Sequence, residues 1–148
     1  MATILLALHN TVRWLVLLAG VVALVRSLQG INGGVDYTTG AKRALSLFTK
    51  SAHLQLALGV LLYFVSPNLR HAMADMSFAM ADKGTRYFIV EHPMLMVLAI
   101  VLATVTGIVA RRGPDDQVKH RRAAIGVALA LALLLAGIPW QRPLLPHF

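Results

Sequence analysis

The feature that most constrains this chain is a set of four long apolar blocks separated by short polar segments. The blocks cover about residues 3–27, 42–65, 86–110 and 121–139, and a helix needs about 20 residues to cross a bilayer core roughly 30 Å thick. Hydrophobic residues make up 57% of the chain and charged residues 14%, without the alternation typical of soluble helices. We therefore predict an all-α integral membrane protein, a single domain with four spans and a short proline-rich tail at 140–148.

The segments between the blocks predict how the spans connect. QGINGGVDYTTGAKR is Gly-rich and predicts a loop, and RRGPDDQVKHRR predicts a tight turn because Pro114 prevents one continuous helix. The segment 66–85 spaces its methionines as a helix would and predicts a short interfacial helix. Short connections favour an antiparallel four-helix up-down bundle. Small residues that predict close helix packing recur on spans three and four: Ala99, Ala103, Gly107, Gly126, Ala130 and Gly137.

The distribution of charge predicts the orientation in the membrane. The net charge is +8, and basic residues gather at the first and third connections, so the positive-inside rule places these connections in the cytoplasm. Both termini and the 66–85 segment are then periplasmic, in a multi-pass protein of the bacterial inner membrane. We expect contacts with membrane lipids and no binding of nucleic acid, because no nucleic-acid-binding motif accompanies the charge.

Two further features of the sequence narrow the alternatives. The first block lacks a basic region before it and contains His9, Asn10 and Arg13, which predicts a retained span rather than a cleaved signal. The chain has no cysteine. Disulfides, thiolate metal sites and covalent haem attachment are therefore excluded, and any metal or haem has to be held by His, Met or carboxylate.

Each of the first three blocks contains a histidine beside a charged residue. A charge at the bilayer centre costs about 2.5–3.5 kcal/mol on insertion scales, so ionisable residues there usually face the interior of a bundle and find partners. Three such combinations predict convergence on one shared site. They are His9 with Arg13, Lys50 with His53, and Glu91 with His92.

These residues fit a site for haem b. In an up-down bundle, spans one and three can lie on opposite sides of the centre, where two imidazoles at one depth could ligate haem iron from its two faces. His92 is the first ligand we expect, with His9 or His53 opposite it. Arg13 or Lys50 would then pair with a propionate, and Glu91 would orient an imidazole or accept a proton.

Other interpretations of the same residues remain open. Glu91 could instead form a buried ion pair with Arg13 or Lys50 that locks the bundle without a cofactor. Glu91 and the histidines could also form a proton or metal site in a small transporter. For His120, among arginines at the start of the last block, we expect a position in the membrane interface.

Several segments together resemble a family of small bacterial four-helix membrane proteins labelled "cytochrome b" or left uncharacterised. The segments are HNTVRWLVLL, HLQLALGVLLYFVSP, RYFIVEHPMLMVLAIVLATVTG and IPW, and the resemblance covers nearly the whole chain. It implies an integral protein of the inner membrane that binds b haem. The motif residues of the family fall here on His9, Arg13, Trp14, His53, Gln55, Glu91, His92 and Trp140.

These residues and this resemblance predict three alternative functions. The first is a b-type cytochrome-like electron-transfer subunit, passing electrons between a quinol or a partner dehydrogenase and an acceptor complex. The second is a cofactor-free accessory subunit of a larger respiratory or photosynthetic membrane complex. The third is the small transporter. In each case we expect the chain to act within a larger complex or a homo-oligomer.

Overall fold

The computed structural model describes residues 2–37 and 40–140, and within these ranges the chain is helical without strands. The long helices are α1 (Ala2–Gly33), α2 (Gly40–Val65), α6 (His92–Arg111) and α7 (Asp116–Ala136). Between α2 and α6 lie α3 (Pro67–Ala74), α4 (Met76–Ala81), α5 (Lys83–Arg86) and the π-helical turn η1 (Tyr87–Glu91). The predicted tail lies outside the described residues apart from Trp140.

Among the described residues, three helical segments are long and apolar enough to cross a membrane: α1, α2 and the continuous segment Lys83–Arg111. Large apolar side chains such as Leu18 and Phe64 are exposed along them, which is unusual for a soluble monomer and indicates a membrane protein. The fourth predicted span, α7, is not among the three. Lys119, Arg121 and Arg122 occupy its first two turns and shorten its apolar part.

The first connection differs from the prediction because α1 continues through residues 28–33. Ser27 and Gly30 are buried there, so packing against the neighbouring elements extends the helix into a Gly-rich stretch. The helix ends next to Gly34, whose φ of +59° is a conformation that glycine adopts readily and other residues rarely do.

The segment 66–85 forms three short helices where we predicted one. Asp75 accepts a hydrogen bond from the Phe78 N–H at 3.0 Å, and Asp82 accepts one from the Thr85 N–H at 2.8 Å. Each aspartate therefore caps a new helix start, and the chain turns at each of these points.

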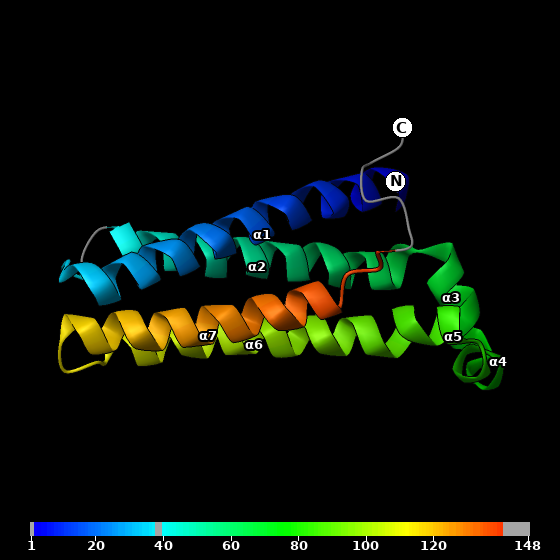
Figure 1. The fold of residues 1–148 in the computed structure, drawn as a ribbon. Helices are drawn as coiled ribbons and strands as arrows, with labels where there is room; N and C mark the ends of the chain where they lie inside the picture. Colours follow the sequence, from blue (N-terminus) through cyan, green and yellow to red (C-terminus); the bar gives the residue numbers. More distant parts are fainter. Residues whose placement is uncertain (1, 38–39, 141–148) are drawn as a thin grey trace.

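Consecutive long helices run in opposite directions (Figure 1). Helix α1 contacts α2 and α7, and α6 contacts α7 and α2, so α1 and α6 lie diagonally across the group. The two basic connections lie at one end of the molecule, while the start of α1 and the short helices α3–α5 lie at the other (Figure 1). This end also holds the residues of the candidate site.

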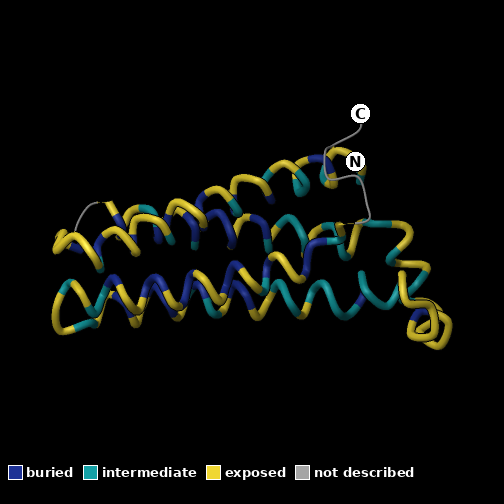
Figure 2. The backbone as a smooth tube through the Cα atoms, in the orientation of Figure 1, coloured by how far each residue is buried: buried dark blue, intermediate teal, exposed yellow. Residues whose placement is uncertain are grey.

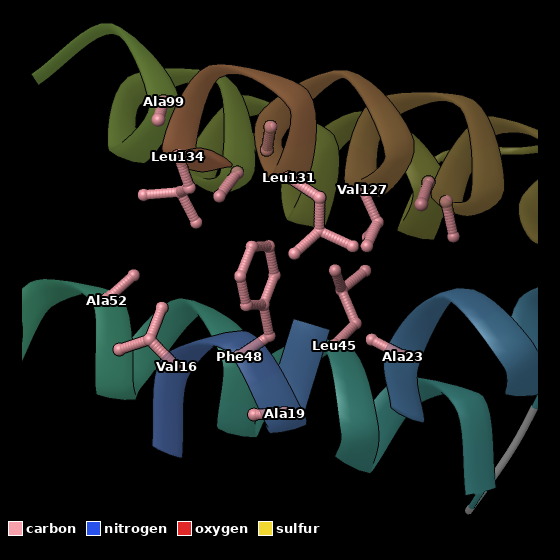
Figure 3. Close-up of a cluster of buried hydrophobic side chains, with 14 of the residues drawn as sticks. Val16, Ala19, Ala23, Leu45, Phe48, Ala52, Ala99, Val127, Leu131 and Leu134 are labelled. Carbon is pink, nitrogen blue, oxygen red and sulfur yellow. The ribbon is translucent and has the colours of Figure 1, made fainter. Parts of the chain in front are cut away.

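The core lies between the α1–α2 pair and the α6–α7 pair. The fully buried ring of Phe48 projects from α2 toward Leu131 and Leu134 of α7 (Figure 3). All six small residues predicted to permit close packing are buried, although an added Cβ on Gly107 would meet nothing within 4 Å. At Gly126, by contrast, an added Cβ would overlap the side chain of Thr106 on α6.

Burial changes along the length of the molecule. Buried residues follow the facing sides of the long helices, whereas η1 and the first turns of α6 are mostly of intermediate burial (Figure 2). The helices are therefore packed less tightly at the end that carries His92.

Candidate functional site

A π-helical turn and a proline set the position of His92. The His92 N–H donates to the Tyr87 carbonyl, five residues back, at the end of η1. Pro93 has no N–H and cannot donate to the Ile89 carbonyl, which instead accepts a hydrogen bond from the Tyr63 hydroxyl of α2 at 3.0 Å. Single π-turns often occur at functional sites, and here the turn places His92 at the start of α6.

The His92 ring is held by the end of α7. Its Nδ1 donates to the Gly137 carbonyl at 2.6 Å, and the Tyr87 hydroxyl donates to the same oxygen at 2.8 Å. Carbonyls at a helix C-terminus lack partners within the helix and carry its negative dipole end, so this oxygen is a strong acceptor. In the neutral ring the proton then lies on Nδ1, and Nε2 keeps its lone pair for another ligand.

His9 faces His92 from α1, on the diagonally opposite helix. The two ring centroids are 6.4 Å apart and the ring planes are inclined at 68°. The His9 ring turns its Nδ1–Cε1 edge toward α2, where a Cβ added to Gly59 would lie 3.3 Å from Cε1 and 3.8 Å from Nδ1. Gln55, one turn earlier on α2, donates from Nε2 to the His9 carbonyl at 3.0 Å.

Both histidines line a cavity of about 980 Å³. Pockets that bury drug-sized ligands have volumes of roughly 300–1,000 Å³. Most of the lining is apolar and comes from α1, α2 and α6, with smaller contributions from α3, α5, η1 and α7; Arg13, Gln55 and Asp82 are among its polar members. Arg13 is only 9% exposed and follows His9 by one turn of α1. The cavity thus combines apolar walls, two imidazoles and a buried guanidinium.

The other predicted site residues lie elsewhere. His53 is exposed, its Nδ1 donates to the Thr49 carbonyl at 2.8 Å, and its Nε2 is 3.4 Å from Thr104 Oγ1. Lys50 is exposed as well, and neither residue belongs to the cavity lining. The structure therefore brings together His9, His92 and Arg13 and leaves Lys50 and His53 outside.

Glu91 has a different partner from those predicted. Its Oε1 is 2.9 Å from Arg86 Nε, and its side chain is 42% exposed. Arg86 lies one π-turn earlier on the same side of the helical segment, which explains why it reaches the carboxylate in place of Arg13 or Lys50. An ion pair with this exposure contributes about 0–1 kcal/mol, and it leaves Glu91 near the surface instead of in the interior.

His120 is buried rather than interfacial. It is 2% exposed, and its Nε2 donates to the Val35 carbonyl at 2.9 Å. Its ring occupies the place that a side chain on Gly30 would take, and it packs edge-on against Tyr37 with 5.0 Å between centroids. The basic residues around it in sequence hid this role, because the glycine that makes room lies in another helix.

Sequence reasoning missed three residues that support the histidine pair: Tyr63 and Tyr87 supply hydroxyl donors, and Gly59 permits close approach of His9. Gly137, predicted as a small packing residue, permits close approach as expected, since an added Cβ there would lie 3.2 Å from Leu95 Cβ. A buried tyrosine hydroxyl needs a partner, so tyrosines at the ends of apolar blocks were the available signal. Their acceptors are main-chain carbonyls, which leave no trace in a sequence.

A bare metal ion and haem need different numbers of ligands from the protein. Within residues 2–37 and 40–140, no group of three or more His, Asp or Glu side chains is arranged to hold a metal ion, whereas zinc sites take three or four protein ligands. Haem iron needs only axial ligands from the protein. With metal–nitrogen bonds of about 2 Å and each nitrogen about 1 Å from its ring centroid, axial imidazole centroids are about 6 Å apart. The histidine pair fits this spacing.

Comparison of the chain with protein-family models, with curated proteins and with solved structures gives no match. The predicted resemblance to small four-helix membrane proteins therefore stays a prediction. What the described residues provide is one imidazole whose Nδ1 donates to a main-chain carbonyl, a second imidazole with its ring centroid 6.4 Å away, and a largely apolar cavity lined by both.

Proposed function

We propose that this protein binds haem b in a membrane and transfers electrons, with His9 and His92 as the axial ligands. The observation that carries the proposal is the 6.4 Å separation of the two imidazoles, from diagonally opposite helices, beside an apolar cavity. Two independent features of the chain, the π-turn at η1 and the Gly59 position on α2, contribute to this spacing. Haem, when bound, supplies one-electron redox chemistry.

The residues around the pair have separate tasks in this proposal. The Gly137 carbonyl keeps the proton of His92 on Nδ1 and increases the basicity of Nε2. The largely apolar lining lowers the local dielectric, which strengthens charge interactions inside the cavity. Arg13 lies in that lining and offers a guanidinium to a propionate carboxylate.

For the membrane arrangement, we propose a four-helix up-down bundle in which α7 is the fourth span. Its contacts with α6 and α1 support this arrangement. The two basic connections lie at the same end of the molecule (Figure 1), and the positive-inside rule puts that end in the cytoplasm of a bacterium. Both termini and the histidine pair then lie toward the periplasmic side of the inner membrane.

The orientation can be tested by cysteine labelling, because the native chain has no cysteine. Asn68→Cys lies at the start of α3, and Asp36→Cys lies in the connection between α1 and α2; both side chains are exposed. In intact cells, a membrane-impermeant maleimide should label the first and not the second. The reverse pattern would contradict the proposed orientation, and permeabilised cells, where both should react, provide the control.

We propose that the redox partners are membrane-embedded, because the described residues form no separate soluble domain. A quinol or a partner dehydrogenase would supply electrons, and an acceptor complex would receive them. The apolar side chains exposed around the long helices offer surfaces for lipids and for such a complex or a second copy of the chain.

The test of the function is an optical spectrum of the detergent-purified protein, oxidised and then reduced with dithionite. We expect a Soret shift with sharp α and β bands, lost in both His9→Ala and His92→Ala. His53→Ala is the matched control, since His53 is exposed outside the cavity, and it should keep the spectrum. A flat visible spectrum that persists after haem is supplied would reject the proposal and favour the cofactor-free accessory subunit.

A further inference from the structure

Two buried polar atoms, one on His9 and one on the neighbouring Gln55, have no hydrogen-bond partner. They are Nδ1 of His9 and Oε1 of Gln55, and the Gln55 residue is only 9% exposed. Buried polar groups are nearly always satisfied, and each exception calls for an explanation such as a water molecule. Because these two unsatisfied atoms belong to adjoining residues, a single explanation should account for both.

The two atoms belong to residues that already touch. The Gln55 amide donates from Nε2 to the His9 carbonyl at 3.0 Å, which commits the amide nitrogen as the donor and leaves Oε1 as an acceptor. The His9 Nδ1 edge faces Gly59, and Gly59 lies four residues after Gln55 on the same face of α2. Both unsatisfied atoms therefore lie between α1 and α2, in the wall of the same cavity.

We infer that Gln55 is a positioning residue for His9, in an arrangement in which one buried water accepts a hydrogen bond from the His9 Nδ1–H and donates one to Gln55 Oε1. A direct hydrogen bond is not formed. A bridging water would satisfy both atoms, given a polar site with room. In this orientation of the water the proton lies on Nδ1 and Nε2 is unprotonated. A water that donated to both atoms would instead leave Nδ1 unprotonated, and the tautomer of His9 distinguishes the two arrangements.

This arrangement would give the two histidines matching support. The C-terminus of α7 fixes the proton of His92 on Nδ1, and α2 does the same for His9 through Gln55. Histidine ligands usually donate their second ring N–H to an acceptor of this kind, and removing the acceptor weakens metal binding by 10–100-fold. The role in haem binding rests on the proposed function, whereas the tautomer of His9 does not.

The first test is therefore made without haem. In protein labelled with ¹⁵N-histidine, the two ring nitrogens of His9 have distinct resonances, assigned by their loss in His9→Ala. We expect the wild type to carry the proton on Nδ1 and Gln55→Leu to lose this preference. Asn68→Leu also removes an amide from the cavity lining and should leave the tautomer unchanged. A proton on Nε2 in the wild type, or no change in Gln55→Leu, would overturn the inference even if haem binds.

The second test uses the reduction potential of the haem-loaded protein. Gln55→Leu should raise the potential and weaken binding of oxidised haem by 10–100-fold, because His9 becomes less basic. Gln55→Glu would lower the potential by its charge alone, so the uncharged Gln55→Leu carries this test and Asn68→Leu is its control. An unchanged potential in Gln55→Leu would overturn the inference, while an absent haem spectrum would reject the proposed function alone.

Discussion

Two histidines at opposite ends of the molecule, His120 and His92, have the same kind of hydrogen-bond partner. His120 donates to the Val35 carbonyl at 2.9 Å, and His92 donates to the Gly137 carbonyl at 2.6 Å. They differ in what surrounds the rest of the ring. The His120 ring fills the space beside Gly30, whereas His92 faces a second imidazole across the lining of a cavity of about 980 Å³.

This difference shows that neither burial nor a hydrogen bond to a main-chain carbonyl distinguishes a structural histidine from a metal ligand. At His120, the ring itself is the packing element, so one nitrogen holds the Val35 connection and no volume is left for a ligand. At His92, the same type of hydrogen bond orients a ring that lines the cavity. Room beside the ring is the feature that supports a binding role.

The glycine beside His120 and the glycine beside His9, the ring that faces His92, should show the largest difference. Gly30→Ala puts a methyl group inside the His120 ring position, so we expect a loss of about 2–4 kcal/mol in the free energy of unfolding, from overpacking and a broken hydrogen bond. At Gly59, the added Cβ would lie 3.3 Å from His9 Cε1, and that ring can shift toward the cavity. Gly59→Ala should therefore cost less than about 1 kcal/mol.

The measurement is unfolding of both variants in the same detergent mixture, followed by circular dichroism. Gly34→Ala is not a suitable control because Gly34 has a positive φ; Gly40→Ala is suitable, since a Cβ there meets nothing within 4 Å. Equal losses in Gly30→Ala and Gly59→Ala would show that the cavity end is packed as tightly as the basic end, which would contradict the difference between the two histidines.

Removing the imidazoles themselves should give opposite results at the two ends. His120→Ala leaves a cavity and an unpaired Val35 carbonyl, and we expect it to cost about 1–3 kcal/mol of stability while keeping any haem spectrum. His92→Ala should abolish the spectrum and cost less stability than His120→Ala, because its ring already borders open space. Parallel spectra and melting curves of the two variants measure both effects. If His120→Ala kept its fold but lost the haem spectrum, the distinction between a structural His120 and a haem-binding His92 would be wrong.

Much of the fold could be predicted from the sequence because long apolar blocks have few alternatives in a membrane. Three of the four predicted spans meet the criteria for crossing, and the small residues on α6 and α7 are buried. The end of α1 was missed because buried packing at Gly30 outweighs the loop tendency of a Gly-rich stretch. The breaks between the short helices depend on Asp75 and Asp82 as caps, a local signal that the methionine pattern obscured.

The candidate site could be predicted only in part. His9 and His92 each lie near the start of a span, and spans one and three of an up-down bundle run in the same direction, so the sequence could place these two residues at the same end of the bundle. His53 could not be separated from them, because its direction depends on the rotation of α2, which a uniformly apolar block leaves undetermined. The partner of Glu91 depends on the π-turn, and the supports of the pair are main-chain carbonyls. Both features arise from the three-dimensional arrangement.

At the basic end, Asp116 offers a smaller, pH-dependent test of the same comparison. It accepts hydrogen bonds from Lys119 Nζ at 2.7 Å and from the Tyr37 N–H at 3.0 Å, tying the connection that covers His120 to α7. The bond from Lys119, followed by that from the Tyr37 main chain, lowers the pKa of Asp116 below its ordinary value. Burial, the larger effect at Tyr37, instead raises the pKa of that hydroxyl and keeps it neutral at physiological pH.

The sign of the effect follows from the lowered pKa. The folded state favours the carboxylate, so the stabilisation is fully present above the ordinary aspartate pKa of about 3.9 and is lost as the pH falls through the lowered pKa in the folded protein. Asp116→Asn should therefore melt below the wild type at pH 6, with the difference shrinking as the pH falls below about 4. Asp36→Asn is the control, because Asp36 is an exposed aspartate in the same connection. A difference in melting temperature that stays constant down to pH 2 would mean that the charge of Asp116 does not stabilise the connection. The connection between α1 and α2 would then be held over His120 by packing alone.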